Sequence, residues 1–164
     1  MMTYKIIVMG VSGCGKSTIA KALAKKLGCR YIEGDDYHPQ ENIDKMRQGI
    51  PLTDEDRQGW LETLNNILVN EGGGATLASS ALKPQYRTTL TDNVENALFV
   101  FLKGDFDTIW QRHQKRKNHF FNGKKMLENQ FDTLVEPIGD NVITVDVRLS
   151  VKKIVEEVCE QIQK

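Results

Sequence analysis

A glycine-rich segment near the start of the chain limits its possible folds more than any other feature. Residues 10–17 have the sequence GVSGCGKS, after an apolar run at residues 6–9 and before the helix-forming residues 18–27. A buried strand, a glycine-rich turn and a helix in this order are typical of a phosphate-binding loop. Glycine lets backbone N–H groups approach a phosphate, and the positive end of the helix dipole attracts its charge. The segment therefore predicts a site for a nucleoside triphosphate.

Two side chains of this loop have specific expected roles. Lys16 is expected to reach the β- and γ-phosphates, and the hydroxyl of Ser17 is expected to bind Mg²⁺. Cys14 is either a small residue that fills the loop or a thiol whose pKa falls beside the helix N-terminus. The alternative for the whole segment is a strand-to-helix turn without a ligand. The predicted nucleotide-binding residues of the segment are Gly10, Val11, Ser12, Gly13, Cys14, Gly15, Lys16, Ser17 and Thr18.

The size and charge of the chain favour a small-molecule partner. A chain of 164 residues can bury the core of one domain, which we assign to residues 1–164. The 22 basic and 22 acidic residues cancel, so no overall field attracts nucleic acid or an anionic membrane. The three cysteines lack metal-binding spacing, no membrane-spanning apolar run is present, and we expect no signal peptide. We expect a cytoplasmic protein with free thiols and with neither nucleic acid nor membrane as partner.

Strand and helix patterns alternate along the chain. Strands are predicted at residues 6–9, 29–32, 75–79, 98–102 and 142–146, and helices at residues 18–27, 39–47 and 126–134 and from residues 53, 83, 105 and 150. This alternation predicts an α/β fold with a parallel sheet covered by helices on both faces. The loops that follow parallel strands share one edge of the sheet, where ligands bind.

Acidic residues follow the second predicted strand, at this ligand-binding edge. Transfer of a phosphoryl group to an alcohol needs a carboxylate that orients the hydroxyl and accepts its proton. Asp35 is the candidate for this base, and Glu33 is a candidate outer-sphere partner of Mg²⁺. The alternative role for Asp35 is to cap the helix that starts near Pro39, and capping is the preferred role for Asp36.

Basic and hydroxyl side chains near the same edge are candidates for binding an anionic, hydroxylated acceptor. Arg57, Lys83 and Arg87 supply positive charge, and an arginine matches a carboxylate bidentately. Each of the three also fits a solvated helix face. His38 either hydrogen-bonds a polyol or holds its turn in place, and Ser80 either binds a sugar or ends the strand.

A polar, basic segment at residues 112–125 is the candidate for a mobile lid over the phosphates. Closure of a lid excludes water and brings arginine to the transferring phosphoryl group. Arg112 and Arg116 are four residues apart and would share one helix face. The alternative is a nucleic-acid patch, since Phe120 and Phe121 are interleaved with the basic residues.

Taken together, these motifs resemble the gluconokinase family. The phosphate loop alone indicates a kinase, whereas His38-Pro39 and the SALK block at residues 80–83 resemble gluconokinases in particular. The matching segments keep their order over nearly the whole chain: residues 8–17, 34–39, 42–52, 54–61, 80–87, 102–107 and 112–137. The resemblance implies a P-loop kinase with a five-stranded parallel sheet that uses ATP and Mg²⁺ to phosphorylate D-gluconate at its 6-hydroxyl. It also implies a homodimer.

The resemblance extends to the roles of single residues. By likeness to shikimate kinases, Asp35 faces the acceptor hydroxyl and Arg57 pairs with the acceptor carboxylate. Glu33 departs from the family pattern, which usually has aspartate at this position. The resemblance also places three arginines at the nucleotide, the first and last beside adenine and the second in the lid: Arg112, Arg116 and Arg148.

Other nucleotide-binding proteins are the competing interpretations. A shikimate-type or other small-metabolite kinase would share the fold, but the gluconokinase-like blocks lie in the acceptor region. A guanine-nucleotide switch would need an Asn-Lys-x-Asp motif after a strand, and the sequence has none. A nucleic-acid-binding ATPase is disfavoured by the zero net charge.

Overall fold

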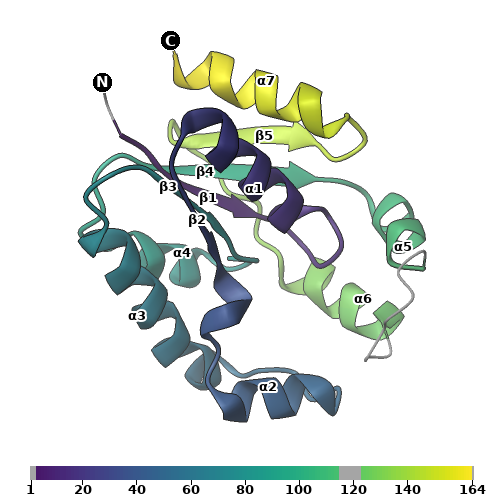
Figure 1. The fold of residues 1–164 in the computed structure, drawn as a ribbon. Coiled ribbons are helices and arrows are strands. Elements are labelled where there is room, and N and C mark those ends of the chain that lie inside the picture. Colours follow the sequence, from purple (N-terminus) through teal and green to yellow (C-terminus); the bar gives the residue numbers. More distant parts are fainter. Residues whose placement is uncertain (1–2, 115–122, 164) are drawn as a thin grey trace.

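The computed structural model describes residues 3–114 and 123–163, and Figure 1 shows their arrangement. The strands form one five-stranded parallel sheet in the order β2-β3-β1-β4-β5. Their bounds are β1 Lys5–Met9, β2 Arg30–Glu33, β3 Ala75–Ala78, β4 Ala97–Lys103 and β5 Val142–Asp146. The helices are α1 Lys16–Leu27, α2 Gln40–Arg47, α3 Asp54–Asn70, α4 Pro84–Thr91, α5 Phe106–Gln114, α6 Gly123–Thr133 and α7 Val151–Ile162, with a short 3₁₀ turn η1 at Gly34–Tyr37.

The central strand β1 explains why the sheet is covered on both faces. Successive side chains of a strand point to opposite faces, and all five residues of β1 are buried. Ile6 and Val8 pack in a cluster with residues of α1 and α7, whereas Ile7 and Met9 pack in a second cluster with residues of α3 and α4. Figure 1 shows α1 and α7 on one side of the sheet and α3 and α4 on the other. The predicted three-layer α/β fold is confirmed.

Several helix ends lie where local sequence signals predict them. Thr53 accepts a hydrogen bond from the Asp56 backbone N–H, and the Asp56 carboxylate accepts one from the Thr53 N–H, so the predicted capping box at the start of α3 is formed. Gly28 ends α1 in the left-handed conformation, with φ 68°. None of the helices within residues 3–114 and 123–163 is long and apolar enough to cross a membrane.

The segment predicted as a lid is in part helical. Arg112 lies in the last turn of α5, and Lys124 and Lys125 lie in the first turn of α6. Helix α6 therefore starts three residues before its predicted beginning at residue 126, because Leu127 is fully buried and fixes this turn against the core. Residues 115–122, which include the predicted Arg116, lie outside the described residues.

The parallel register brings the loops that carry the candidate site to one edge of the sheet. Val8 pairs with Ala78, and Ala78 also aligns with Glu33 of β2. On the other side of β1, Met9 pairs with Phe101 of β4. Figure 1 shows the phosphate loop, α5 and α6 beyond the carboxyl ends of β1 and β4. This is the edge at which ligands of open α/β sheets bind.

Candidate active site

The shape of the phosphate loop requires glycine at two positions, because the neighbouring residues leave no room there for a side chain. A Cβ on Gly10 would lie 2.7 Å from the Cys14 sulfur, and one on Gly13 would lie 2.6 Å from Cδ2 of His113. Both glycines also have φ in the left-handed region, at 149° and 84°. The backbone N–H of Gly10 donates to the carbonyl of Ser80, which ties the phosphate loop to the loop after β3.

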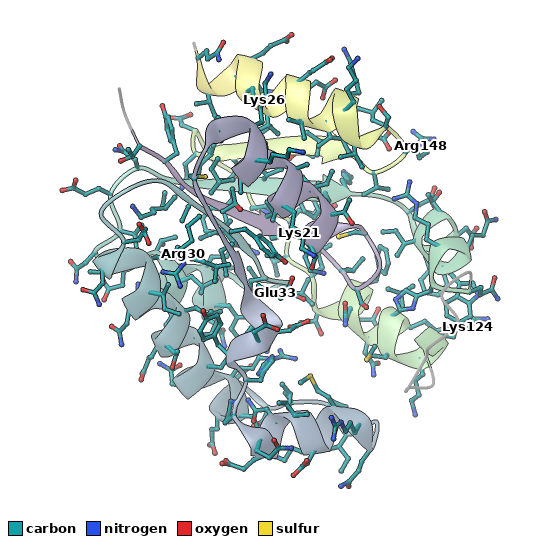
Figure 2. The ribbon with its side chains drawn as sticks, in the orientation of Figure 1. Lys21, Lys26, Arg30, Glu33, Lys124 and Arg148 are labelled. Atoms are coloured by element: carbon teal, nitrogen blue, oxygen red, sulfur yellow. The ribbon has the colours of Figure 1, made fainter. Side chains whose placement is uncertain are left out.

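Within the loop, Lys16 and Ser17 lie at the first turn of α1. The Lys16 ammonium donates to the Val11 carbonyl at 3.1 Å, so its charged end lies over the loop itself. The Ser17 hydroxyl donates to Oε2 of Glu33 at 2.5 Å, and the Tyr31 hydroxyl donates to the same oxygen. Burial, and next the hydrogen bond to Glu33, raise the pKa of Tyr31 to about 12. Figure 2 shows Glu33 where β2 ends, below α1.

The oxygen atoms around Ser17 fit a magnesium ion. A hydroxyl and a carboxylate are hard oxygen donors, and Mg²⁺ usually combines one or two of them with phosphate oxygens and water. Among the residues that the structure describes, no three His, Cys, Asp or Glu side chains gather as a metal site of their own. The pair of Ser17 and Glu33 therefore suits an ion that arrives with the nucleotide.

Asp35 lies on η1, directly after β2. Its side chain is 81% exposed, so it is open to an incoming substrate. The protein that surrounds it at longer range desolvates the carboxylate and raises its pKa, whereas the Lys16 ammonium acts in the opposite direction. The prediction that Asp36 caps the following helix is wrong, because Pro39 occupies the N-cap of α2 and no described side chain caps it. The acidic pair lies within η1, and residues 37–39 separate it from α2.

His38 holds the acidic turn against α3. Its ring is buried and stacks on Trp60 at a centroid distance of 4.1 Å, and its Nδ1 is 3.2 Å from the Asn42 amide nitrogen. The Trp60 indole N–H donates to the carbonyl of Gly34 at 2.7 Å. Burial, helped by the charge of Arg57, lowers the pKa of His38 to about 4. His38 is therefore neutral at neutral pH, and its Nε2 lies 3.8 Å from Oδ1 of Asp35.

The buried His38 predicts a stability that depends on pH. Between its folded pKa of about 4 and its ordinary value of 6.5, the unfolded chain binds a proton that the folded chain does not. The free energy of unfolding is therefore up to about 3 kcal/mol higher above pH 6.5, and this difference is lost as the pH falls toward 4. Urea unfolding across this range should show a flatter pH dependence for His38→Gln than for the original protein. Equal pH dependence of the two proteins would contradict this assignment.

Two of the predicted acceptor-binding cations meet at one tyrosine ring. The charged groups of Arg57 and Lys83 lie 5.2 Å and 5.5 Å from the ring centroid of Tyr86. Arg57 donates to the Tyr86 hydroxyl at 2.8 Å, and that hydroxyl donates to Asp54 at 2.5 Å. Lys83 forms an ion pair with Asp54 at 3.0 Å. Hydrogen bonds from Tyr86 and then Lys83 lower the pKa of Asp54, so its carboxylate balances part of the positive charge.

The third predicted cation, Arg87, does not join this group. Its guanidinium is buried and donates to the carbonyls of Ala81, at 2.7 Å, and Val135, at 2.9 Å. Burial lowers the pKa of Arg87. The side chain therefore connects the loop after β3 to the segment that follows α6.

The arginines predicted beside adenine lie near the loop after β5. Arg112 of α5 donates to the carbonyl of Val147. Arg148 is exposed and paired with Asp146 through two guanidinium nitrogens, at 3.1 Å and 2.8 Å from its carboxylate oxygens. Figure 2 shows Arg148 between the end of β5 and the start of α7. The loop thus holds both arginines at the same edge of the sheet as the phosphate loop.

Comparison with known proteins places the chain in a family. Residues 12–163 match the family model for shikimate kinase. The chain is 41% identical over 163 residues to the thermoresistant gluconokinase of Escherichia coli K12, an alignment that covers 96% of this chain and 93% of the relative. The chain belongs to the gluconokinase family. A second family member, a probable gluconokinase from Dictyostelium discoideum, is 41% identical over 167 residues, which cover 93% of this chain and 83% of the relative.

A solved gluconokinase structure has the same fold. The crystal structure of a gluconokinase from Sinorhizobium meliloti superimposes with a TM-score of 0.90 at 39% identity. The match covers 98% of this chain and 91% of the other. The gluconokinase resemblance predicted from sequence motifs is therefore confirmed at the level of both sequence and fold.

Proposed function

We propose that this chain is a gluconokinase that transfers the γ-phosphoryl group of ATP to the 6-hydroxyl of D-gluconate. The observation that carries the proposal is the 41% identity to a gluconokinase over 93% of that relative's length. The alignment covers 96% of this chain, so it includes the acceptor side of the site as well as the phosphate loop. The products would be ADP and 6-phospho-D-gluconate.

On the nucleotide side, the backbone amides of the phosphate loop would bind the phosphates. Lys16 would leave the Val11 carbonyl and move its ammonium to the β- and γ-phosphates, a change that needs only side-chain rotation. Ser17 would hold Mg²⁺, with Glu33 behind it as an outer-sphere partner. When bound, this ion neutralises charge on the phosphates and orients them. Arg112 and Arg148 are the proposed partners of adenine, and Arg116 is proposed to reach the transferring group.

On the acceptor side, Asp35 is the proposed general base. Its carboxylate is exposed beside the phosphate loop, and it would accept the hydroxyl proton as the oxygen attacks phosphorus. His38 and Ser80 are proposed to border the sugar acid, since both lie at the loops that follow β2 and β3. His38 would act as a neutral hydrogen-bonding group.

Arg57 is the proposed partner of the gluconate carboxylate. Lys83 is paired with Asp54, and Arg87 is bonded to two backbone carbonyls. Arg57 has one hydrogen bond among the described residues, to the Tyr86 hydroxyl, so most of its N–H groups can still take a carboxylate. A bidentate arginine–carboxylate pair is also stronger and more specific than a lysine pair. Lys83 and Arg87 were equal candidates in the sequence.

Replacing Arg57 by methionine is expected to weaken gluconate binding without affecting ATP. Loss of a hydrogen-bonded charge pair costs about 1.5–3 kcal/mol, so the KM for gluconate should rise about 10- to 100-fold. Steady-state kinetics with each substrate varied in turn measures this. Lys83→Met is the matched control, because it removes a second cation that lies against the same ring. A larger rise in the KM for gluconate for Lys83→Met than for Arg57→Met would indicate that Lys83 binds the gluconate carboxylate.

The substrate itself is tested by a coupled assay of ADP release. Wild-type protein should release ADP with gluconate and little with shikimate, AMP or no acceptor. Phosphorus NMR of the product would identify the phosphorylated hydroxyl. Activity with shikimate alone would indicate a kinase with a different acceptor. ADP release that needs no acceptor would refute the assignment of the chain as a kinase. The proposed homodimer is tested separately, by sedimentation.

A further inference from the structure

Two helices on the far side of the phosphate loop contact the same residue of it. The Ser12 backbone N–H donates to Oε1 of Gln130, on α6, at 2.6 Å. From α5, Nε2 of His113 lies 3.2 Å from both the carbonyl oxygen and the hydroxyl of Ser12. Ser12 is separated from these residues by 118 and 101 positions in the sequence. Side chains from two elements therefore contact both backbone polar groups of a single loop residue, its N–H and its carbonyl oxygen.

The shape of the loop depends on the same contact. The His113 ring lies so close to Gly13 that a Cβ there would be 2.6 Å from Cδ2 and 3.0 Å from Nε2. His113 is 4% exposed, so the ring cannot move away without opening the core. Ser12 and Gly13 are thus fixed by one hydrogen-bonded side chain and one packed ring. They belong to the loop whose backbone amides are proposed to bind the phosphates.

Packing between α5 and α6 does not require the amide of Gln130. Apolar contacts already join the two helices: Ile109 and Leu127 are buried, and the Phe106 and Phe131 rings lie 5.7 Å apart. Gln130 is only partly buried, and its carbonyl oxygen is directed to the phosphate loop rather than to α5. A backbone N–H that is removed from water needs such an acceptor. The bond therefore serves the loop.

We infer that Gln130 and His113 are positioning residues that hold the phosphate loop in its nucleotide-binding shape. The inference rests on the proposed function in one respect only, namely that this loop binds the phosphates of ATP. With the Ser12 backbone fixed on both sides of its Cα, the following amides converge without first having to be ordered, so binding loses less conformational entropy. Neither side chain needs to touch the nucleotide. Part of the affinity for ATP is thus determined by α5 and α6.

Gln130→Met tests the inference, because methionine keeps the length of the side chain and removes the hydrogen-bond acceptor. The Kd of ADP, measured by calorimetry, should rise about tenfold, while the KM for gluconate and the Tm of the free protein stay near those of the original. Asn129→Met is the matched control, since Asn129 is exposed on the same helix and its loss should leave the Kd unchanged. His113→Phe, which keeps a ring but loses Nε2, should also weaken ADP binding.

Two results would overturn the inference. One is an unchanged Kd for ADP in a folded Gln130→Met protein. The other is a fall in ADP affinity and Tm together with a rise in the KM for gluconate, which would indicate a general loosening of the fold. Hydrogen exchange of the Ser12 amide in the unaltered protein gives an answer even where a variant does not fold: slow exchange is expected, and the rate of a free amide would refute the bond. ADP binding without gluconate phosphorylation would refute the proposed function and leave this inference standing.

Discussion

Replacing Asp35 by asparagine is expected to lower kcat by about 10²- to 10⁴-fold, the usual range for loss of a general base. Asparagine keeps the size of the side chain and its hydrogen bonding but cannot accept a proton. Because Asp35 is exposed on η1 and forms no helix cap, the substitution should leave the fold intact. The affinity for ADP should remain, or rise slightly as a negative charge near the phosphates is lost.

The neighbouring Asp36 supplies the control for this prediction. Asp36→Asn removes an equal charge one position away and should retain most of the activity. The pH profile adds an independent check: because desolvation raises the pKa of Asp35, the acid limb of kcat/KM should lie above the ordinary value of 3.8. Below that limb the base is protonated and activity falls. A kcat for Asp35→Asn equal to that of the original protein would show that Asp35 is not the general base.

Replacing Lys16 by methionine is expected to lower kcat by about 10²- to 10³-fold, as for other donors that stabilise charge in a transition state. The transferring phosphoryl group carries negative charge on its oxygen atoms, and methionine has no positive charge to compensate it. The KM for ATP should also rise. In the free protein the ammonium donates a hydrogen bond to the Val11 carbonyl at the partly buried loop, so little stability should be lost.

Lys25→Met on the same helix is the appropriate comparison for Lys16→Met. Lys25 is exposed in the last turn of α1, far from the phosphate loop, and its substitution should leave both kinetic constants unchanged. Single-turnover kinetics with saturating ATP would separate the chemical step from binding. If Lys16→Met kept the original rate in that experiment, the ammonium would not act on the transferring group.

The fold could be predicted because its signals are local. The apolar run that becomes β1, the GVSGCGKS loop and the capping box at Thr53 each depend on residues within a few positions. Alternation of such segments leaves few topologies for a parallel sheet, and one edge then collects the loops. The approximate position of the candidate site follows from topology alone.

The hydrogen bonds of individual side chains could not be predicted in the same way. Arg87, Lys83 and Arg57 are equivalent as sequence, yet the structure directs Arg87 to carbonyls that include one 48 residues away. Nothing in the sequence pairs Gln130 with Ser12, because their contact depends on how α6 packs. Tyr86 lies in a segment that resembles gluconokinases, but its contact with the two remaining cations was not predicted. These features depend on distances across the assembled core.

The buried guanidinium of Arg87 has a mechanical consequence. It fastens the loop that carries the acceptor-side cation Lys83 to the segment leaving α6, while Gln130 of that helix holds the phosphate loop. The loops proposed to receive the sugar acid and the triphosphate are therefore both tied to α6 or to the segment directly after it. Any effect that binding at one of these loops has on affinity at the other must be reciprocal and of the same factor.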